Sequence, residues 1–121
     1  MGSRQTLGSS MDLRLDVSER DGWSVLAVGG EVDVATAPRL RERLVAMVGA
    51  GSHAIVVDLD DVEFIDSTGL GVLIGARKRV SPHDGDVRLV CNESRIVRVF
   101  EITGLDKVFA IYDSVDDAVA P

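Results

Sequence analysis

The sequence is poor in cysteine and in aromatic residues, and it contains no long apolar run. With Cys91 as the single cysteine, an internal disulfide is excluded. No stretch approaches the roughly 20 apolar residues that a membrane-spanning helix needs, and no charged-then-apolar leader opens the chain. We therefore expect a cytoplasmic protein with no membrane partner.

Basic residues are also in short supply, with 13 Lys and Arg against 20 Asp and Glu and a net charge of −7. Proteins that bind nucleic acids usually present a basic surface and aromatic side chains that stack on bases. Aromatic residues make up only 4% of this chain. The composition therefore predicts no nucleic-acid partner and favours partners with cationic patches.

The 121 residues suffice for one domain with a buried core and are too few for two. The opening residues, MGSRQTLGSS, are polar and show no periodicity. We interpret residues 1–10 as a flexible tail of the kind that an expression vector leaves, with Met11 as a candidate natural start. The domain is predicted over residues 11–121.

Apolar periodicity after the tail predicts an α/β domain. Alternating residues favour two strands at 11–19 and 23–30, joined by a hairpin turn at Asp21-Gly22. Further strands are predicted at 53–62, 87–91 and 107–112, and helices after Thr36, at 67–80, at 93–103 and after Ser114. We predict one mixed central sheet, with an antiparallel opening hairpin and then mostly parallel strands, covered by about four helices.

Residues 64–75, FIDSTGLGVLIG, have the most distinctive chemistry of the chain, but they do not form an enzyme motif. Ile65 stands where a G-x-S-x-G elbow needs its first glycine, and the glycines miss G-x-G-x-x-G by one residue. The remaining candidates for catalysis or metal binding form no recognisable triad or ligand set: His53, His83, Asp58, Asp60 and Asp61. We therefore expect no catalytic residue, no metal and no cofactor.

Two interpretations fit Asp66-Ser67-Thr68 within this segment. Ser67 could cap the helix that follows, because its hydroxyl would accept a hydrogen bond from a first-turn amide. It could also accept phosphate, which a helix N-terminus favours and which changes the surface charge by about −1.5 to −2. The glycines that follow indicate either close packing on the sheet or an approach by another molecule: Gly69, Gly71 and Gly75.

Three segments together carry a resemblance to a known family: GGEVDVATAPRLRERL, VEFIDSTGLGVLIGARKRV and VRLVCNESRIVRVFEITGLDKVFAIYDSVDDAV. They are similar to the bacterial anti-sigma-factor antagonists of the STAS domain family, and close to its actinobacterial developmental and stress-regulating members. The similarity runs over about residues 11–120. The D-S-T-G-L-G stretch combined with an upstream G-E-V-D is its most specific part.

The resemblance implies a binding module rather than an enzyme, with Ser67 as the phosphoacceptor. In such proteins the kinase is the anti-sigma factor, which binds ATP on its own fold. The unphosphorylated antagonist binds that kinase and frees the sigma factor, and a serine phosphatase restores this form. Asp33 matches a family position near the partner's nucleotide, and Thr68 matches a neighbour that shapes the site. The rest of the motif completes the partner-binding and site-shaping set: Asp66, Gly69, Leu70 and Gly71.

Two alternatives stand beside this function. The chain could be a small-ligand or nucleotide-sensing STAS module of a larger regulatory assembly. A receiver-like domain phosphorylated on aspartate would need a helix after its first strand, which the Asp21-Gly22 hairpin contradicts. A weak homodimer is compatible with the antagonist function and with the ligand-sensing function. The basic run at 77–79 is either a solvated helix end or a surface that meets acidic residues of a partner.

Overall fold

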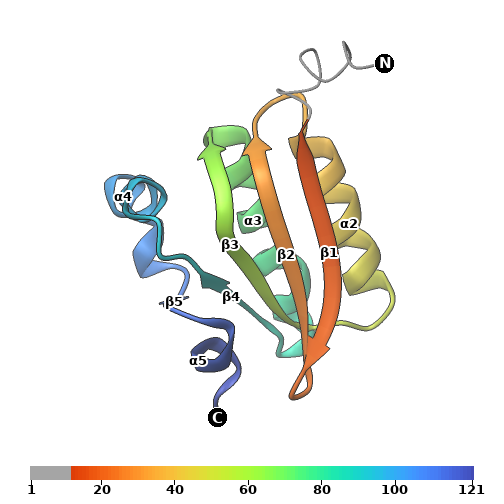
Figure 1. The fold of residues 1–121 in the computed structure, drawn as a ribbon. Helices are drawn as coiled ribbons and strands as arrows, with labels where there is room; N and C mark the ends of the chain where they lie inside the picture. Colours follow the sequence, from red (N-terminus) through yellow and green to blue (C-terminus); the bar gives the residue numbers. More distant parts are fainter. Residues whose placement is uncertain (1–11) are drawn as a thin grey trace.

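One five-stranded sheet organises the structure. A computed structural model describes residues 12–121, and the predicted tail and Met11 lie outside the described residues (Figure 1). The strands follow one another across the sheet in sequence order: β1 Leu13–Arg20, β2 Trp23–Val32, β3 Ala54–Ile65, β4 Asp86–Val90 and β5 Ile111–Tyr112. β1 and β2 pair antiparallel, and each later pair is parallel. The predicted mixed sheet with its opening hairpin is confirmed.

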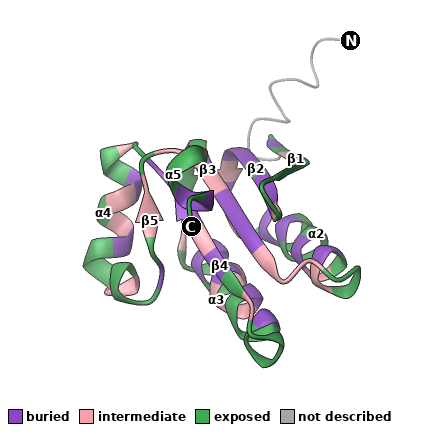
Figure 2. Ribbon diagram, turned by 90° about the horizontal axis from the view of Figure 1, so that it is seen from below, coloured by how far each residue is buried: buried purple, intermediate pink, exposed green. Residues whose placement is uncertain are grey.

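Helices cover both faces of this sheet, but unequally. The helices and 3-10 turns of the described residues are α2 Ala37–Gly49, α3 Ser67–Val80, η2 Ser81–His83, α4 Ser94–Thr103, η3 Leu105–Lys107 and α5 Val115–Val119. α2, α3 and α4 enclose the larger core on one face, whereas α5 packs on the other face over a smaller apolar cluster (Figure 2). Across residues 12–121, no helix is both long enough and apolar enough to cross a membrane.

The last predicted strand is mostly wrong. Leu105–Lys107 forms η3, and only Ile111–Tyr112 pairs with β4. Phe109 is 2% exposed and meets Phe100 of α4 edge-on, with 6.5 Å between the ring centroids. Because the core takes in Phe109, the chain turns toward α4 before it can run beside β4.

A stacked pair of side chains holds α5 on the sheet. The Arg88 guanidinium of β4 lies 4.3 Å from the centre of the Trp23 ring at the start of β2. Arg88 Nη1 also donates a hydrogen bond of 2.7 Å to the carbonyl oxygen of Ala118 in α5. The terminal helix is thus fixed to two strands by one arginine.

Gly30 allows the chain to enter β1 close to the end of β2. Its φ is +96°, and an added Cβ would lie 1.9 Å from the carbonyl oxygen of Asp12. That oxygen accepts a 3.1 Å hydrogen bond from the amide of Glu31. A side chain at this position therefore meets both backbone strain and a clash with backbone.

Replacing Gly30 with alanine should lower the free energy of unfolding by more than about 1 kcal/mol, because the left-handed φ and the clash act together. Gly49→Ala is the matched control: Gly49 ends α2, and nothing lies within 4 Å of an added Cβ there. Urea denaturation of both variants and the parent protein measures the difference. Equal midpoints for the two variants would contradict this account.

Candidate functional site

Ser67 opens α3 directly after β3, but it does not cap the helix. Asp66 has extended backbone, and its Oδ1 accepts hydrogen bonds from the amides of Thr68 at 2.9 Å and Gly69 at 3.2 Å. Asp66 is therefore the N-cap, and the predicted cap by Ser67 is wrong. Ser67 is already the first helical residue, and its exposed side chain takes no part in the cap. The predicted helix at 67–80 is confirmed.

The carboxyl ends of β2 and β3 bring the two predicted motifs to one edge of the sheet. Val32 pairs with Ile65 in the parallel ladder, and the Asp66 amide donates a 3.1 Å hydrogen bond to the Val32 carbonyl. Asp33, the next residue after β2, thus enters its loop at the edge where α3 begins. Neighbouring parallel strands end at the same side of a sheet, which is where open α/β folds place their sites.

Asp33 shapes the loop that leads from β2 into α2. Its Oδ1 accepts hydrogen bonds from the amides of Ala35 at 2.9 Å and Thr36 at 3.1 Å. Thr36, after which the helix was predicted, occupies the N-cap position of α2, but its buried hydroxyl donates to the Glu31 carbonyl at 2.7 Å instead of capping the helix. The half-buried Asp33 carboxylate therefore orders the loop and still reaches the surface.

Within D-S-T-G-L-G, the structure separates surface residues from supporting ones. Ser67, Thr68 and Gly71 are exposed, whereas Gly69 is buried and Leu70 is only 5% exposed. An added Cβ at Gly69 would lie 2.6 Å from a side-chain carbon of β2. Close packing on the sheet thus accounts for Gly69. Gly69 and Leu70 can support the site from beneath, and the three exposed residues and the half-buried Asp66 can touch another molecule.

The sequence patterns do not predict the exposure of two apolar side chains at this edge. Val34, in the loop after β2, is 73% exposed, and Phe64, near the end of β3, is 49% exposed. The residue types alone suggest burial for both. A register shift between Gly30 and Glu31 of β2 changes which side chains of β3 face outward, and the alternation of the sequence carries no signal for such a bulge.

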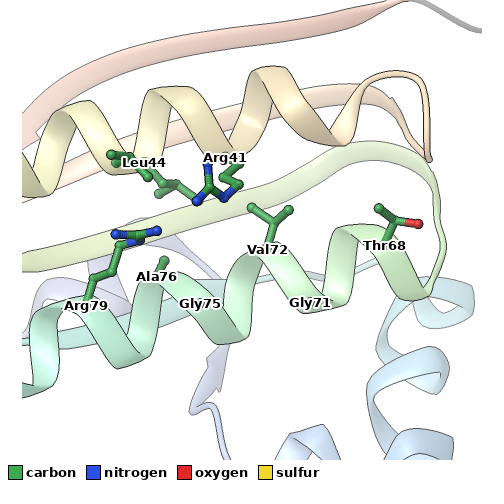
Figure 3. A pocket seen from close by; sticks show the side chains of 9 residues that line it. Arg41, Leu44, Thr68, Gly71, Val72, Gly75, Ala76 and Arg79 are labelled. Atoms are coloured by element: carbon green, nitrogen blue, oxygen red, sulfur yellow. The ribbon is translucent and has the colours of Figure 1, made fainter.

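A shallow groove of about 200 Å³ lies between α2 and α3 and has Thr68 at one end (Figure 3). Arg41 reaches into it from α2 and Arg79 from α3. Nothing lies within 4 Å of an added Cβ at Gly71 or Gly75, which also line the groove. Packing on the sheet therefore does not account for these two glycines, although it does account for Gly69.

The other candidates from the sequence lie away from this edge. His53 precedes β3, at the opposite end of that strand from Ser67, and stacks on His83 with 3.9 Å between the ring centroids. Among residues 12–121, no group of three or more His, Cys, Asp or Glu is placed to hold a metal ion.

Asp58 is an acidic residue whose carboxyl group is partly buried and lies near other carboxylates. It lies half-buried on β3, and this burial raises the pKa of its carboxyl above the ordinary value of 3.8. A hydrogen bond from the Asp60 amide lowers the pKa, while the charges of Asp60 and Asp61 raise it. The net shift is upward, so the folded protein holds this proton more tightly than the unfolded chain does.

Known proteins are similar to this chain in sequence and in fold. The STAS domain family matches residues 14–118. The anti-sigma-B factor antagonist of Staphylococcus aureus is 36% identical over 106 residues, which cover 88% of this chain and 98% of that protein. The solved structure of an anti-sigma factor antagonist from Mycobacterium paratuberculosis is similar with a TM-score of 0.83 and 35% identity, over 89% of this chain and 92% of the other.

A more distant structure shares the fold alone. SpoIIAA in its unphosphorylated form aligns with a TM-score of 0.67 and 18% identity, over 87% of this chain and 91% of the other. The overall fold is therefore retained where most side chains differ.

Removing the cap tests the assignment of roles at the start of α3. Asp66→Ala should lower the free energy of unfolding by about 0.5–2 kcal/mol, because two first-turn amides lose their acceptor. Ser67→Ala should change it by less than about 0.5 kcal/mol, as expected for an exposed residue outside the cap. Thermal or urea unfolding measures both, with Asp66→Asn as the control that keeps an acceptor oxygen. A larger loss in Ser67→Ala than in Asp66→Ala would reverse the assignment.

The raised pKa of Asp58 predicts a pH-dependent stability. Because the folded state binds this proton more tightly, the contribution of Asp58 to the free energy of unfolding is lost as pH rises from about 3.8 through the raised pKa. Asp58→Asn should therefore be more stable than the parent protein at pH 7, with a difference that shrinks in acid. Asp16→Asn, an exposed change on β1, is the control for net charge. A gain no larger than that of the control would argue against burial as the cause.

Proposed function

The chain belongs to the STAS domain family, and we propose that it is an anti-sigma-factor antagonist, which binds an anti-sigma factor and so frees a sigma factor. The support is the match to proteins of that name at 36% and 35% identity over nearly their whole length. In this proposal the chain acts by binding, and the anti-sigma factor catalyses the phosphorylation that regulates the binding.

Phosphate on Ser67 is proposed to switch this binding off. The observation that carries the proposal is the exposed Ser67 side chain at the start of α3, outside the cap that Asp66 forms. A kinase can modify this hydroxyl without removing a hydrogen bond that the fold needs. The N-terminus of a helix also tolerates an anion, because its dipole and its amides favour negative charge.

The local surface explains why the added charge would weaken an interface. Phosphate brings about −1.5 to −2 charges, and the Asp33 and Asp66 carboxylates belong to the same edge of the sheet. The exposed Val34 and Phe64 offer apolar contact there. A partner that covers this edge must then take a phosphate out of water beside carboxylates, which is costly.

The partners of the proposed cycle follow from what this chain carries. The sequence contains no phosphate-binding loop of the G-x-x-x-x-G-K type, so ATP is assigned to the anti-sigma factor, which acts as the serine kinase. A serine phosphatase would return the antagonist to its binding form. The exchange would take place in the cytoplasm, where sigma factors meet RNA polymerase.

Mass spectrometry and binding titrations test the switch together. Incubation with the anti-sigma factor kinase of the same organism and ATP should add one phosphate, on Ser67, and the phosphorylated protein should bind that kinase at least roughly tenfold more weakly because charge enters the interface. Ser67→Ala should stay unmodified and keep its affinity, and Ser67→Glu should fold and bind weakly.

Thr68→Val is the matched control, since Thr68 is the adjacent exposed hydroxyl. This variant should still be phosphorylated on Ser67. Modification of Thr68 in place of Ser67 would refute the acceptor assignment, and equal affinity of the modified and unmodified proteins would remove the switch. Phosphate incorporation with ATP in the absence of any kinase would contradict the assignment of catalysis to the partner.

A further inference from the structure

α2 and α3 carry an excess of exposed basic side chains on an acidic protein. The two helices carry six basic side chains and one acidic side chain, Glu42, in a chain with a net charge of −7. The basic residues are Arg39, Arg41, Arg43, Arg77, Lys78 and Arg79. A surface of one sign raises the local concentration of oppositely charged partners and speeds their association.

These basic side chains are not used by the fold. The ion pairs within the described residues belong to other arginines: Arg14, Arg20, Arg88 and Arg95. None of the six cations of α2 and α3 pairs with a carboxylate of residues 12–121. They can therefore meet the carboxylates of another molecule without first breaking an internal contact.

The groove between the two helices gives two of these cations a common target. Figure 3 shows Arg41 and Arg79 reaching into the space between α2 and α3. From Thr68 to Arg79 the groove follows α3 for three turns, or roughly 16 Å. Gly71 and Gly75 keep its floor open, since nothing lies within 4 Å of an added Cβ. A long, shallow groove of this kind suits a segment of protein chain laid along it.

We propose that this groove docks an acidic amphipathic segment of the anti-sigma factor, an inference that rests on the proposed function. Apolar side chains of the segment pack on Val45 and Val72, which line the groove, while its carboxylates pair with Arg41 and Arg79. Arg41 and Arg79 could also bind a phosphate, but a nucleotide or a lipid headgroup fits less well, because the rest of the lining is apolar and only Thr68 could orient a sugar, a base or a glycerol.

The position of the groove also connects docking to the switch. Its end at Thr68 adjoins Ser67, the proposed phosphoacceptor. Phosphate on Ser67 places negative charge at that end and repels acidic groups of the segment that lie near Thr68. The carboxylate paired with Arg79 lies roughly 16 Å away, where salt screens most of the repulsion. The same modification then acts on the sheet edge and on the groove.

The test uses two probes: the anti-sigma factor kinase, and a synthetic helical peptide with leucines every three or four residues and glutamates at both ends. A second peptide carries glutamine in place of each glutamate. Arg41→Glu reverses a groove cation, and Gly75→Leu fills the floor where the space is open. Arg98→Glu, an exposed change on α4, is the matched control. Melting curves establish that each variant is folded, and amide NMR signals report where the peptide binds.

We expect the acidic peptide to shift the signals of Gly71 and Gly75, and its glutamine counterpart to leave them unchanged. Each groove variant should weaken the binding of peptide and kinase roughly tenfold or more, whereas Arg98→Glu should bind as the parent protein does. Binding of ATP or of phosphatidylglycerol vesicles at these glycines in place of the peptide would overturn the choice of occupant.

The outcomes also separate this inference from the proposed function. Kinase binding that neither groove variant alters would overturn the docking site and leave the antagonist function standing. A protein that takes the acidic peptide in the groove, yet neither binds the kinase nor is phosphorylated by it, would overturn the function together with the identity of the docked segment. Such a result would leave only the preference of the groove for acidic helices.

Discussion

Asp66 is the residue on which the candidate site depends. Its amide ties the end of β3 to Val32 of β2, and its carboxylate accepts hydrogen bonds from two amides in the first turn of α3. One residue thus ends the strand and begins the helix, and it meets donors that would otherwise be left without a partner. Ser67 comes next and has no part in either task. Its side chain can change chemically without loosening the helix that presents it.

The choice of cap could not be made from the sequence, because Asp and Ser are both good N-cap residues. The N-cap is the last residue whose backbone is still extended before the helix begins, and here that residue is Asp66. That boundary follows from the pairing of Val32 with Ile65, a contact between strands that are far apart in the chain. The helix itself was predictable, since its apolar stretch and basic end form a local pattern. Local patterns thus locate the elements, while hydrogen bonds at the site depend on strand register.

The same distinction separates the other elements and the groove. The Asp21-Gly22 hairpin is a two-residue signal, and the antiparallel β1–β2 pair confirms it. The strand expected at 107–112 shrinks because the core draws in Phe109, which no alternation of residues can reveal. The groove forms where α2 and α3 face each other, so its cations come from two separate segments of the chain. From sequence, only the basic run of α3 pointed toward an acidic partner, and that interpretation stays a prediction.

Electrostatics explain why one phosphate would be enough for the proposed switch. Two unit charges 4 Å apart interact by about 1 kcal/mol in bulk water and by about 4 kcal/mol near a protein surface. A tenfold change in affinity needs only about 1.4 kcal/mol, so even a partly screened repulsion moves binding by an order of magnitude. The fold bears little of this cost, because a helix N-terminus accommodates the anion. Since Asp66 rather than Ser67 makes the cap, the charge of a phosphorylated Ser67 would act on what docks at this edge and not on the stability of α3.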